Sequence, residues 1–313
     1  MTNVFFRATE DALVAITSIF DFVHPLCASL QYSHKVANEH YKKTSVTNNF
    51  SYQTIFDPEK KIHGTNYYKA FVQTSYEEQE ELLAWVLLNN LFAIHEGWGK
   101  RLYDDLFINF NYKEEKFIKK LEREGLSSNM RTYFLKSDHI SSFMKDAFYD
   151  SYKQKSKLDI SKLDNYMLLY RVFKEFRNCY MHNNRLASHR LISAYNDYQP
   201  IATPRGLDIT EVPVLFAPSL HEPVKLSIRG VIGFSCFLQR ILIISDLYLL
   251  QTKAAEEELI NRKPISWSTK TIGGNTAKQQ SHVKRYVSSC GLLKPNYSNE
   301  LKDYLIHKHI LSL

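Results

Sequence analysis

Residues 168–185 read LLYRVFKEFRNCYMHNNR, and the spacing of apolar side chains in this stretch guides the interpretation of the whole chain. Aromatic and aliphatic residues recur at steps of three and four, which is the period of an amphipathic α-helix. Ser161, followed three residues later by Asp164, is typical of a helix N-terminus. The apolar stripe comprises Tyr166, Leu169, Phe173, Phe176 and Tyr180. The pattern predicts a helix over 162–183 that packs an aromatic face into a core.

Polar residues in the same stretch add two features that an ordinary core helix lacks. At about 100° per residue, Arg177 lies within roughly 20° of Tyr170, at the edge of the aromatic stripe. An unpaired guanidinium is costly there, so we expect Arg177 to be paired or to bind a ligand. A second, polar stripe runs down the helix through Arg171, Glu175, Asn178 and His182. This stripe places an imidazole at the end of the predicted helix.

The composition indicates a globular, mainly helical protein. Of the 313 residues, 44% are hydrophobic and 13% aromatic, so the chain is long enough to bury a core and too apolar to be disordered throughout. It has only ten glycines and nine prolines and long runs of Leu, Lys and Glu, which favours the all-α class. The formal net charge of +7 favours a polyanionic partner such as RNA.

We expect three parts along the chain. Residues 1–74 form an N-terminal helical extension and connector, and residues 75–262 form a helical-bundle domain. A proline-rich loop insertion interrupts this domain at 187–226, and long loops of this kind are often functional. Residues 263–313 form a C-terminal tail that carries one short helix at about 298–311.

Local signals give further expectations within these parts. One or two helices cover 11–41 and are broken near Pro25, because proline removes a helix hydrogen bond. Some strand is expected at 50–56, and 209–216 fits short edge strands. Lys113–Glu124 reads as a short charged helix ended by glycine.

The bundle itself is predicted from four strongly periodic stretches. Ser75 and Glu78 form a capping box ahead of the first, whose buried side is predicted to include Leu82, Trp85, Leu88 and Phe92. The last is apolar nearly all round, so it needs partners on more than one side. The helices that we expect to pack together cover 76–107, 138–154, 162–183 and 227–261.

The sequence favours a reducing, cytoplasmic location and no membrane partner. The four cysteines are far apart and form no C-x-x-C pair, which argues against a disulfide framework or a zinc knuckle. Glu10 and Asp11 precede the first apolar run, unlike the basic start of a signal peptide. The apolar run 231–250 contains Arg240 and Asp246, which are costly in a bilayer, so we expect a buried helix there.

No pattern points to a cofactor or a metal. The H-E-x-x-H, P-loop, G-x-S-x-G and G-x-G-x-x-G motifs are absent, and Gly273-Gly274 lacks the spacing of a phosphate loop. We therefore expect chemistry that uses side chains alone.

The residues Arg177-Asn178-Cys179-Tyr180-Met181-His182 resemble the hallmark of the HEPN superfamily, in which an arginine, usually followed by a polar residue, precedes a histidine. Glu96 followed by Lys100 and Arg101 is similar to a Glu-x-x-x-Lys-Arg motif that accompanies this hallmark in some of these families. A simpler interpretation of Glu96 and Lys100 is a surface ion pair at i, i+4.

The resemblance covers about residues 75–261 and implies a helical bundle with a two-copy ribonuclease site. Many members are metal-independent ribonucleases of toxin–antitoxin, abortive-infection and CRISPR-associated systems, which implies RNA as substrate and an antitoxin or sensor as a further partner. Members that a nucleotidyltransferase modifies carry tyrosine two residues after the histidine. Here that position is Asn184, so we expect no modification at this site.

Physical chemistry agrees with what the resemblance implies. Cleavage of RNA without a metal needs a proton acceptor for the 2′-hydroxyl, a proton donor for the leaving oxygen, and a cation for the phosphoryl charge. Histidine can serve in either of the first two roles, and arginine in the third. Arg177 and His182 are five residues apart and diverge by roughly 140° on an ideal helix. Two copies, in contact partly through 231–250, would bring these groups together.

Two interpretations therefore stand at the level of sequence. In the first, the chain is a homodimeric endoribonuclease in which Arg177, His182 and Asn178 act directly and Glu96, Lys100 and Arg101 support them. In the second, it is a non-catalytic RNA-binding or regulatory module in which Arg177 pairs with a carboxylate and His182 caps the helix end.

Overall fold

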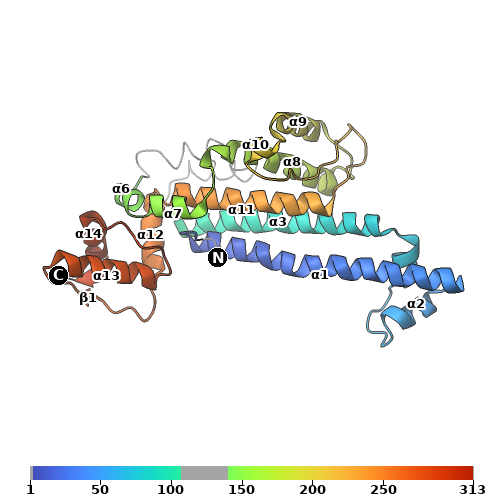
Figure 1. Ribbon diagram of the computed structural model, residues 1–313, viewed down its shortest axis with the longest axis horizontal. Coiled ribbons are helices and arrows are strands. Elements are labelled where there is room, and N and C mark those ends of the chain that lie inside the picture. Colours follow the sequence, from blue (N-terminus) through green and yellow to red (C-terminus); the bar gives the residue numbers. More distant parts are fainter. Residues whose placement is uncertain (1–2, 107–139, 313) are drawn as a thin grey trace.

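Long helices packed side by side form the body of the protein, for which the computed structural model describes residues 3–106 and 140–312. Helices hold 69% of the residues and strands 3%, so the predicted all-α class is confirmed. Helix α8 (Leu163–His182) packs across two of the long helices, α3 and α11. The three long helices in Figure 1 are α1 (Arg7–Thr44), α3 (Tyr76–Leu106) and α11 (Ile228–Leu249).

Helix α3 begins where the sequence predicts. Ser75 Oγ accepts a hydrogen bond from the Glu78 N–H at 3.1 Å, and the Glu78 carboxylate accepts one from the Ser75 N–H at 2.9 Å, which completes the capping box. Leu82, predicted to be buried, is 44% exposed, because it lies about 120° around the helix from buried Leu88. The other predicted core residues, Trp85, Leu88 and Phe92, are buried.

Helix α8 also forms nearly where predicted, after a 3-10 turn at Ile160–Lys162. The predicted cap at Ser161 is wrong. Asp159 accepts the Ser161 N–H at 3.0 Å and caps the 3-10 turn, since the chain starts to coil two residues earlier than expected. The aromatic face is buried as predicted through Tyr166, Leu169, Phe173 and Phe176, and Tyr180 is half-buried at its end.

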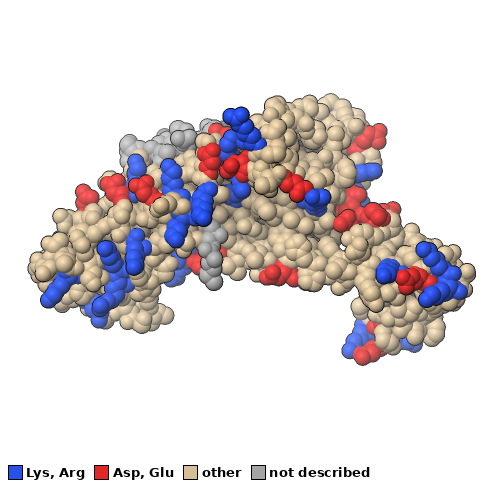
Figure 2. All heavy atoms as spheres, viewed as in Figure 1, with Lys and Arg blue, Asp and Glu red and all other residues tan. Residues whose placement is uncertain are grey.

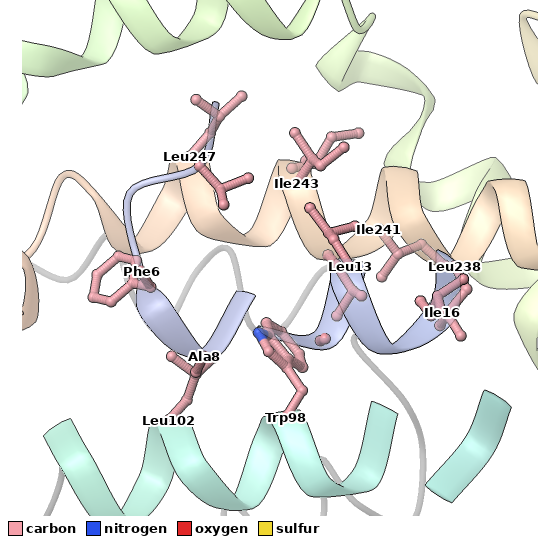
Figure 3. Packing of buried hydrophobic residues seen from close by; sticks show 14 of the residues in the cluster. Phe6, Ala8, Leu13, Ile16, Trp98, Leu102, Leu238, Ile241, Ile243 and Leu247 are labelled. Carbon is pink, nitrogen blue, oxygen red and sulfur yellow. The ribbon is translucent and has the colours of Figure 1, made fainter. Parts of the chain in front are cut away.

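Helix α11 lies at the centre of the core, buried on nearly every side as its sequence predicts. Its Phe234 ring stacks on Phe173 of α8 at 4.4 Å and lies 5.5 Å from Phe92 of α3, so one side chain joins three helices. Figure 3 shows apolar residues of α1, of the residue before it, and of α3 and α11 packed together: Phe6, Ala8, Leu13, Ile16, Trp98, Leu102, Leu238, Ile241, Ile243 and Leu247.

The prediction of a single helix over 227–261 is wrong, because the chain turns after Leu249. The Thr252 hydroxyl donates to the Leu249 carbonyl at 2.6 Å, in competition with the regular helix bonds. A separate helix, α12 (Lys253–Asn261), follows and leaves the axis of α11 (Figure 1).

The predicted break in the first helix is also wrong. Helix α1 is continuous, with Pro25 inside it. Proline leaves the carbonyl of Asp21 without its helix partner, but both residues are exposed, so water can bond that carbonyl. Packing of α1 along α3 supports the uninterrupted helix.

The strand predicted at 50–56 is instead a helix, α2 (Asn49–Phe56). The side chain of Asn48 accepts the Ser51 N–H at 3.0 Å and so starts this helix. After α2, a π-helical turn covers Lys69–Gln73. A small second core forms here from Ala37, Tyr52 and Tyr67.

The helix predicted over 138–154 is irregular where it is described. Met144, Ala147 and Phe148 are buried, as helical spacing predicts. Residues 138–139 and the helix predicted over 113–124 lie outside the described residues. The elements observed are α6 (Ser142–Met144), a π-helical turn at Lys145–Tyr149 and α7 (Asp150–Ser156).

The predicted loop insertion at 187–226 is largely helical in its first part, so the loop prediction is wrong there. Ser188 caps its main helix by accepting the Leu191 N–H at 3.2 Å, and Leu191, Ala194 and Tyr198 are buried at helical spacing. This helix packs against α8. No strand forms at 209–216, where the described chain is irregular. The elements are α9 (His189–Tyr198), a 3-10 turn at Gln199–Ile201 and α10 (Pro204–Leu207).

The C-terminal part is a folded unit rather than a tail with one helix. The predicted helix is present, and Ser298 caps it by accepting the Leu301 N–H at 3.1 Å. A second helix was not predicted, although its sequence is amphipathic. Two short parallel strands pair Lys270 with Leu311. The elements are β1 (Lys270–Thr271), α13 (Thr276–Ser289), α14 (Asn299–His307) and β2 (Leu311–Ser312).

Two of the described helices, α1 and α11, have the length and hydropathy of a membrane span. The apolar window of α11 is 72% buried inside the fold, as expected for a core helix, whereas that of α1 is 17% buried. The absence of a membrane partner stays a prediction.

The start of α1 is held by carboxylates from other helices. The backbone N–H groups of Phe5 and Phe6 donate to Asp246 of α11 at 2.6 and 3.0 Å. Arg7 N–H donates to Glu258 of α12 at 2.8 Å. Burial raises the pKa of Asp246 to about 7, even though both backbone N–H bonds lower it. These carboxylates satisfy donors that the first turn of a helix leaves unpaired.

Replacement of Asp246 tests this anchor. Asp246→Ala leaves two buried N–H groups without an acceptor and should lower the free energy of unfolding by about 2–5 kcal/mol, measured by urea denaturation. Asp246→Asn keeps one carbonyl oxygen and should lose about half as much. Equal, small losses in both variants would contradict the anchoring role.

Candidate active site

Aromatic contacts fix the second half of α8 against α3. The Trp85 indole stacks on the Tyr180 ring with centroids 4.4 Å apart, and Phe92 meets Tyr170 edge to face at 5.2 Å. Each such pair contributes about 0.5–1.5 kcal/mol beyond the area it buries. Because these contacts lie on both sides of Arg177 in the helix, they determine where its side chain meets α3.

Arg177 reaches from α8 to Glu96 on α3. Its Nη2 lies 3.9 Å from Glu96 Oε1, with the arginine side chain 28% exposed and the glutamate 51% exposed. This separation forms an ion pair but is too long for a hydrogen bond. The buried Nε of Arg177 has no hydrogen-bond partner among the described residues. The guanidinium is therefore paired, as expected, and through its exposed part it can also reach an oxyanion.

The structure separates the three charged residues of the second motif. Glu96 forms its ion pair with Arg177 and not with Lys100 four residues later. Arg101 turns to α1, where its Nη1 lies 2.5 Å from Asp11 Oδ2. Lys100 is exposed and makes no ion pair with a described residue. Of the supporting residues, only Glu96 is brought to Arg177.

His182 lies apart from the arginine. It is the last residue of α8 and is exposed, and its ring makes no hydrogen bond within the described part of the chain. Asn178, one turn earlier, donates to Glu175 Oε2 at 3.4 Å rather than to the imidazole. None of the described residues therefore holds the His182 ring, which can meet a ligand or a second copy.

The chain after His182 turns sharply. Asn184 and Arg185 both have positive φ, 48° and 65°, a strained conformation that asparagine tolerates better than arginine. The Arg185 guanidinium stacks over the Tyr180 ring at 4.7 Å, which helps to hold this turn. Arg171, at the other end of the polar stripe, pairs with Asp197 of α9 at 3.0 Å and has a structural role.

Sequence reasoning missed His95, which adjoins Glu96 and is buried between α3 and α8. Its Nδ1 lies 3.2 Å from the Tyr170 hydroxyl, and its buried Nε2 has no hydrogen-bond partner among the residues that the structure describes. Burial, together with the nearby positive charge of Lys174, lowers the pKa of His95 to about 4, so the ring is neutral at pH 7. Its spacing from Leu88 and Phe92 could have shown that it falls on the buried face.

These groups define what the site can do chemically. Arg177 can bind a phosphate oxygen, and exposed His182 can transfer a proton. Glu96 can orient the guanidinium. Among residues 3–106 and 140–312, no group of three or more His, Cys, Asp or Glu side chains is placed to hold a metal ion.

Comparison with known proteins gives no assignment. No family model matches the chain, and no curated protein or solved structure matches it either. Its function is therefore argued from Arg177, Glu96 and His182 and from the resemblance in their spacing.

The neutral state of His95 predicts a pH dependence of stability. Its folded pKa of about 4 lies below the ordinary value of 6.5, so the folded state loses stability as the pH falls from about 6.5 to about 4. His95→Gln removes this titration. Relative to the variant, the wild type should lose about 3 kcal/mol of unfolding free energy across that range, measured by urea denaturation at several pH values. A constant difference between the two proteins would show that His95 is accessible to protons when folded.

Proposed function

We propose that this protein is a metal-independent endoribonuclease of the HEPN type, which cuts RNA through the RNA's own 2′-hydroxyl. The observation that carries the proposal is the half-buried Arg177, whose ion pair with Glu96 is too long for a hydrogen bond and whose Nε has no hydrogen-bond partner among the described residues. A guanidinium held in this way suits a phosphate, which accepts two parallel hydrogen bonds. The exposed His182 on the same helix supplies the proton-transfer group.

The proposed reaction needs no cofactor. A histidine accepts the proton of the 2′-hydroxyl, the 2′-oxygen forms a bond to phosphorus, and the bond from phosphorus to the 5′-oxygen breaks. A second protonated histidine gives its proton to that leaving oxygen. Arg177 stabilises the negative charge on the phosphoryl oxygens. The products are a 2′,3′-cyclic phosphate and a 5′-hydroxyl.

In this proposal the remaining residues act through these two. Glu96 orients the Arg177 guanidinium, from which its carboxylate is 3.9 Å away. Asn178 lies one helical turn before His182 and orients the imidazole in the assembled site. Lys100 is exposed near this surface and supports RNA binding by charge, whereas Arg101 holds α3 to α1 through Asp11.

The active form in this proposal is a homodimer, because one copy does not join Arg177 to His182. Helix α11 leaves little surface for the dimer contact expected at 231–250, since 16 of its residues are buried within the chain. Exposed apolar side chains lie on α1 and α3 instead, among them Val14, Phe22 and Val86. These residues are the better candidates for a surface that a second copy covers.

We place the enzyme among cytoplasmic toxins or phage-defence effectors. An antitoxin or sensor protein would restrain it, because an unrestrained ribonuclease harms its own cell. This part of the proposal derives from the resemblance to the HEPN superfamily.

A second candidate function is a non-catalytic RNA-binding or regulatory module. One observation favours it: Arg177 forms an ion pair with Glu96. An arginine with a purely structural role would form the same pair, so the pair does not require catalysis. The two functions differ in whether His182 is needed for more than binding.

Substitution of the two central residues tests catalysis. His182→Ala and Arg177→Ala should each lower RNA cleavage by about 10² or more, measured by single-turnover kinetics in EDTA, because each removes a group used in the transition state. Glu96→Ala should have a smaller effect. DNA and 2′-O-methylated RNA should resist cleavage.

The chain offers matched controls for these variants. Arg171→Ala removes an arginine from the same helix, and His189→Ala removes an exposed histidine from the next. Neither should change the cleavage rate more than about twofold. Full activity of His182→Ala, or a requirement for a divalent metal, would favour the regulatory module instead.

Mixing two inactive variants tests the two-copy site. Arg177→Ala carries an intact His182, and His182→Ala carries an intact Arg177, so a mixed dimer contains one arginine and one histidine across its interface. Cleavage should rise above that of either variant after the two proteins are mixed and exchange subunits, but should stay well below that of the wild type, because the mixed dimer holds one His182 and the reaction uses two. Sedimentation should show a dimer at micromolar concentration. If the mixture stays inactive although subunit exchange is shown, the Arg177 and His182 that act together belong to the same chain.

A further inference from the structure

The positive charge of this protein is concentrated in its C-terminal unit. Residues 263–313 contain eight Lys or Arg and two Asp or Glu, a net charge of +6, whereas the whole chain contains 40 and 33, a net charge of +7. All the other residues together therefore contribute only +1. Figure 2 shows Lys and Arg side chains gathered over the end of the molecule that holds α13 and α14. A charge that is confined to one region indicates a partner for that region.

A hollow of about 320 Å³ lies on this unit, beside α13. Three cations line it, Lys284 and Arg285 from the helix and Lys294 from the segment that follows. All three are exposed and make no hydrogen bond or ion pair with a described residue. The hydroxyl and amide side chains of Gln280, Ser281 and Ser288 complete the polar lining. We call these six residues the basic hollow.

The fold of α13 explains why these side chains gather. Val283, Tyr286 and Val287 are buried on the inner face of the helix. At about 100° per residue, Ser281, Lys284 and Ser288 lie within roughly 60° of one another on the outer face. The small serines leave space on both sides of the lysine along the helix. The outer face is therefore open in the middle and positively charged.

Backbone contacts hold Lys294 opposite the helix. Gly291 adopts a φ of +76°, which turns the chain back after α13. The N–H of Leu293 donates to the Tyr152 hydroxyl at 3.1 Å, and the N–H of Asn296 donates to the Ala147 carbonyl at 2.8 Å. Lys294 lies between these two anchors, so its position beside α13 is set by the fold.

The acidic residues of the unit do not neutralise the basic hollow. Asp303 pairs with Lys302 at 3.3 Å, and neither Glu300 nor Asp303 lines the hollow. Three cations close together repel one another unless an anion joins them. The site is thus complementary to a ligand with several negative charges.

We propose that the basic hollow binds the sugar–phosphate backbone of RNA and docks the substrate of the ribonuclease. Lys, Arg, Ser and Gln side chains can contact phosphate and sugar oxygens, and among the described residues no aromatic ring lines the hollow for base stacking. The site therefore binds RNA without regard to sequence. The choice of RNA among polyanions rests on the proposed function.

The place of the hollow in the fold defines its contribution. In Figure 1, α13 lies at one end of the long axis, and α8 lies over the body of the molecule. The hollow is thus remote from Arg177 and contacts a part of the RNA that does not react. Loss of the hollow raises KM and leaves kcat unchanged, because binding by a remote group is equal in the ground and transition states.

The test is RNA binding by the full chain carrying His182→Ala, which separates binding from cleavage. Adding Lys284→Gln, Arg285→Gln and Lys294→Gln should weaken binding of a mixed-sequence single-stranded RNA about 10²-fold at 0.1 M salt. The slope of log K against log salt should fall in magnitude by about 2, since three phosphate contacts are lost. Lys35→Gln, Lys42→Gln and Lys43→Gln, in the exposed C-terminal half of α1, are the matched control and should change binding less than threefold.

Each outcome decides the inference. Equal weakening by both triple variants would overturn it in favour of a general charge effect, and an unchanged affinity of the hollow variant would overturn it outright. Efficient competition by polyglutamate would assign the hollow to an acidic protein. Lys284→Arg with Lys294→Arg should retain binding, and thermal melts of all variants should match that of the His182→Ala parent. If wild type binds RNA through the hollow and never cuts it, only the proposed function fails.

Discussion

The buried carboxylate of Asp246 is the interaction on which the arrangement of the helices depends. It accepts the N–H groups of Phe5 and Phe6, and so holds the start of α1 against the C-terminal end of α11. One turn further on, Thr9 accepts the Trp98 indole N–H at 3.1 Å, which sets α3 against α1. Trp98 is two residues from Glu96. The carboxylate that faces Arg177 is therefore placed through a chain of contacts that begins at Asp246.

The candidate site combines a rigid half with an open half. Arg177 pairs with Glu96 on a part of α8 that the aromatic contacts of Tyr170 and Tyr180 hold against α3, while His182 ends the helix in solvent. A guanidinium at a fixed place can bind a phosphate without losing much side-chain entropy. An exposed imidazole can reach a partner on a second copy. The half-buried Arg177 is thus suited to binding a phosphate, and the exposed His182 is suited to transferring a proton.

Much of the fold was predictable because the signals are local. The capping box of Ser75 and Glu78 and the aromatic stripe of α8 act between residues three or four apart, so they can be recognised in the sequence. The errors have a different origin. Helix α9 was not predicted, because the prolines of 187–226 are typical of a loop and they follow this helix closely in the sequence. Pro25 was predicted to break α1, but it is tolerated inside the helix because solvent reaches that turn.

The sequence by itself determined the helical class, the aromatic face of α8 and the positions of Arg177 and His182 along it. Only the tertiary structure decided the partners of those residues. Glu96 meets Arg177 rather than Lys100, His95 is buried and neutral, and Lys294 lies beside α13. The physical reason is that helical period depends on the nearest neighbours in the chain, whereas these pairings depend on the register in which distant helices pack.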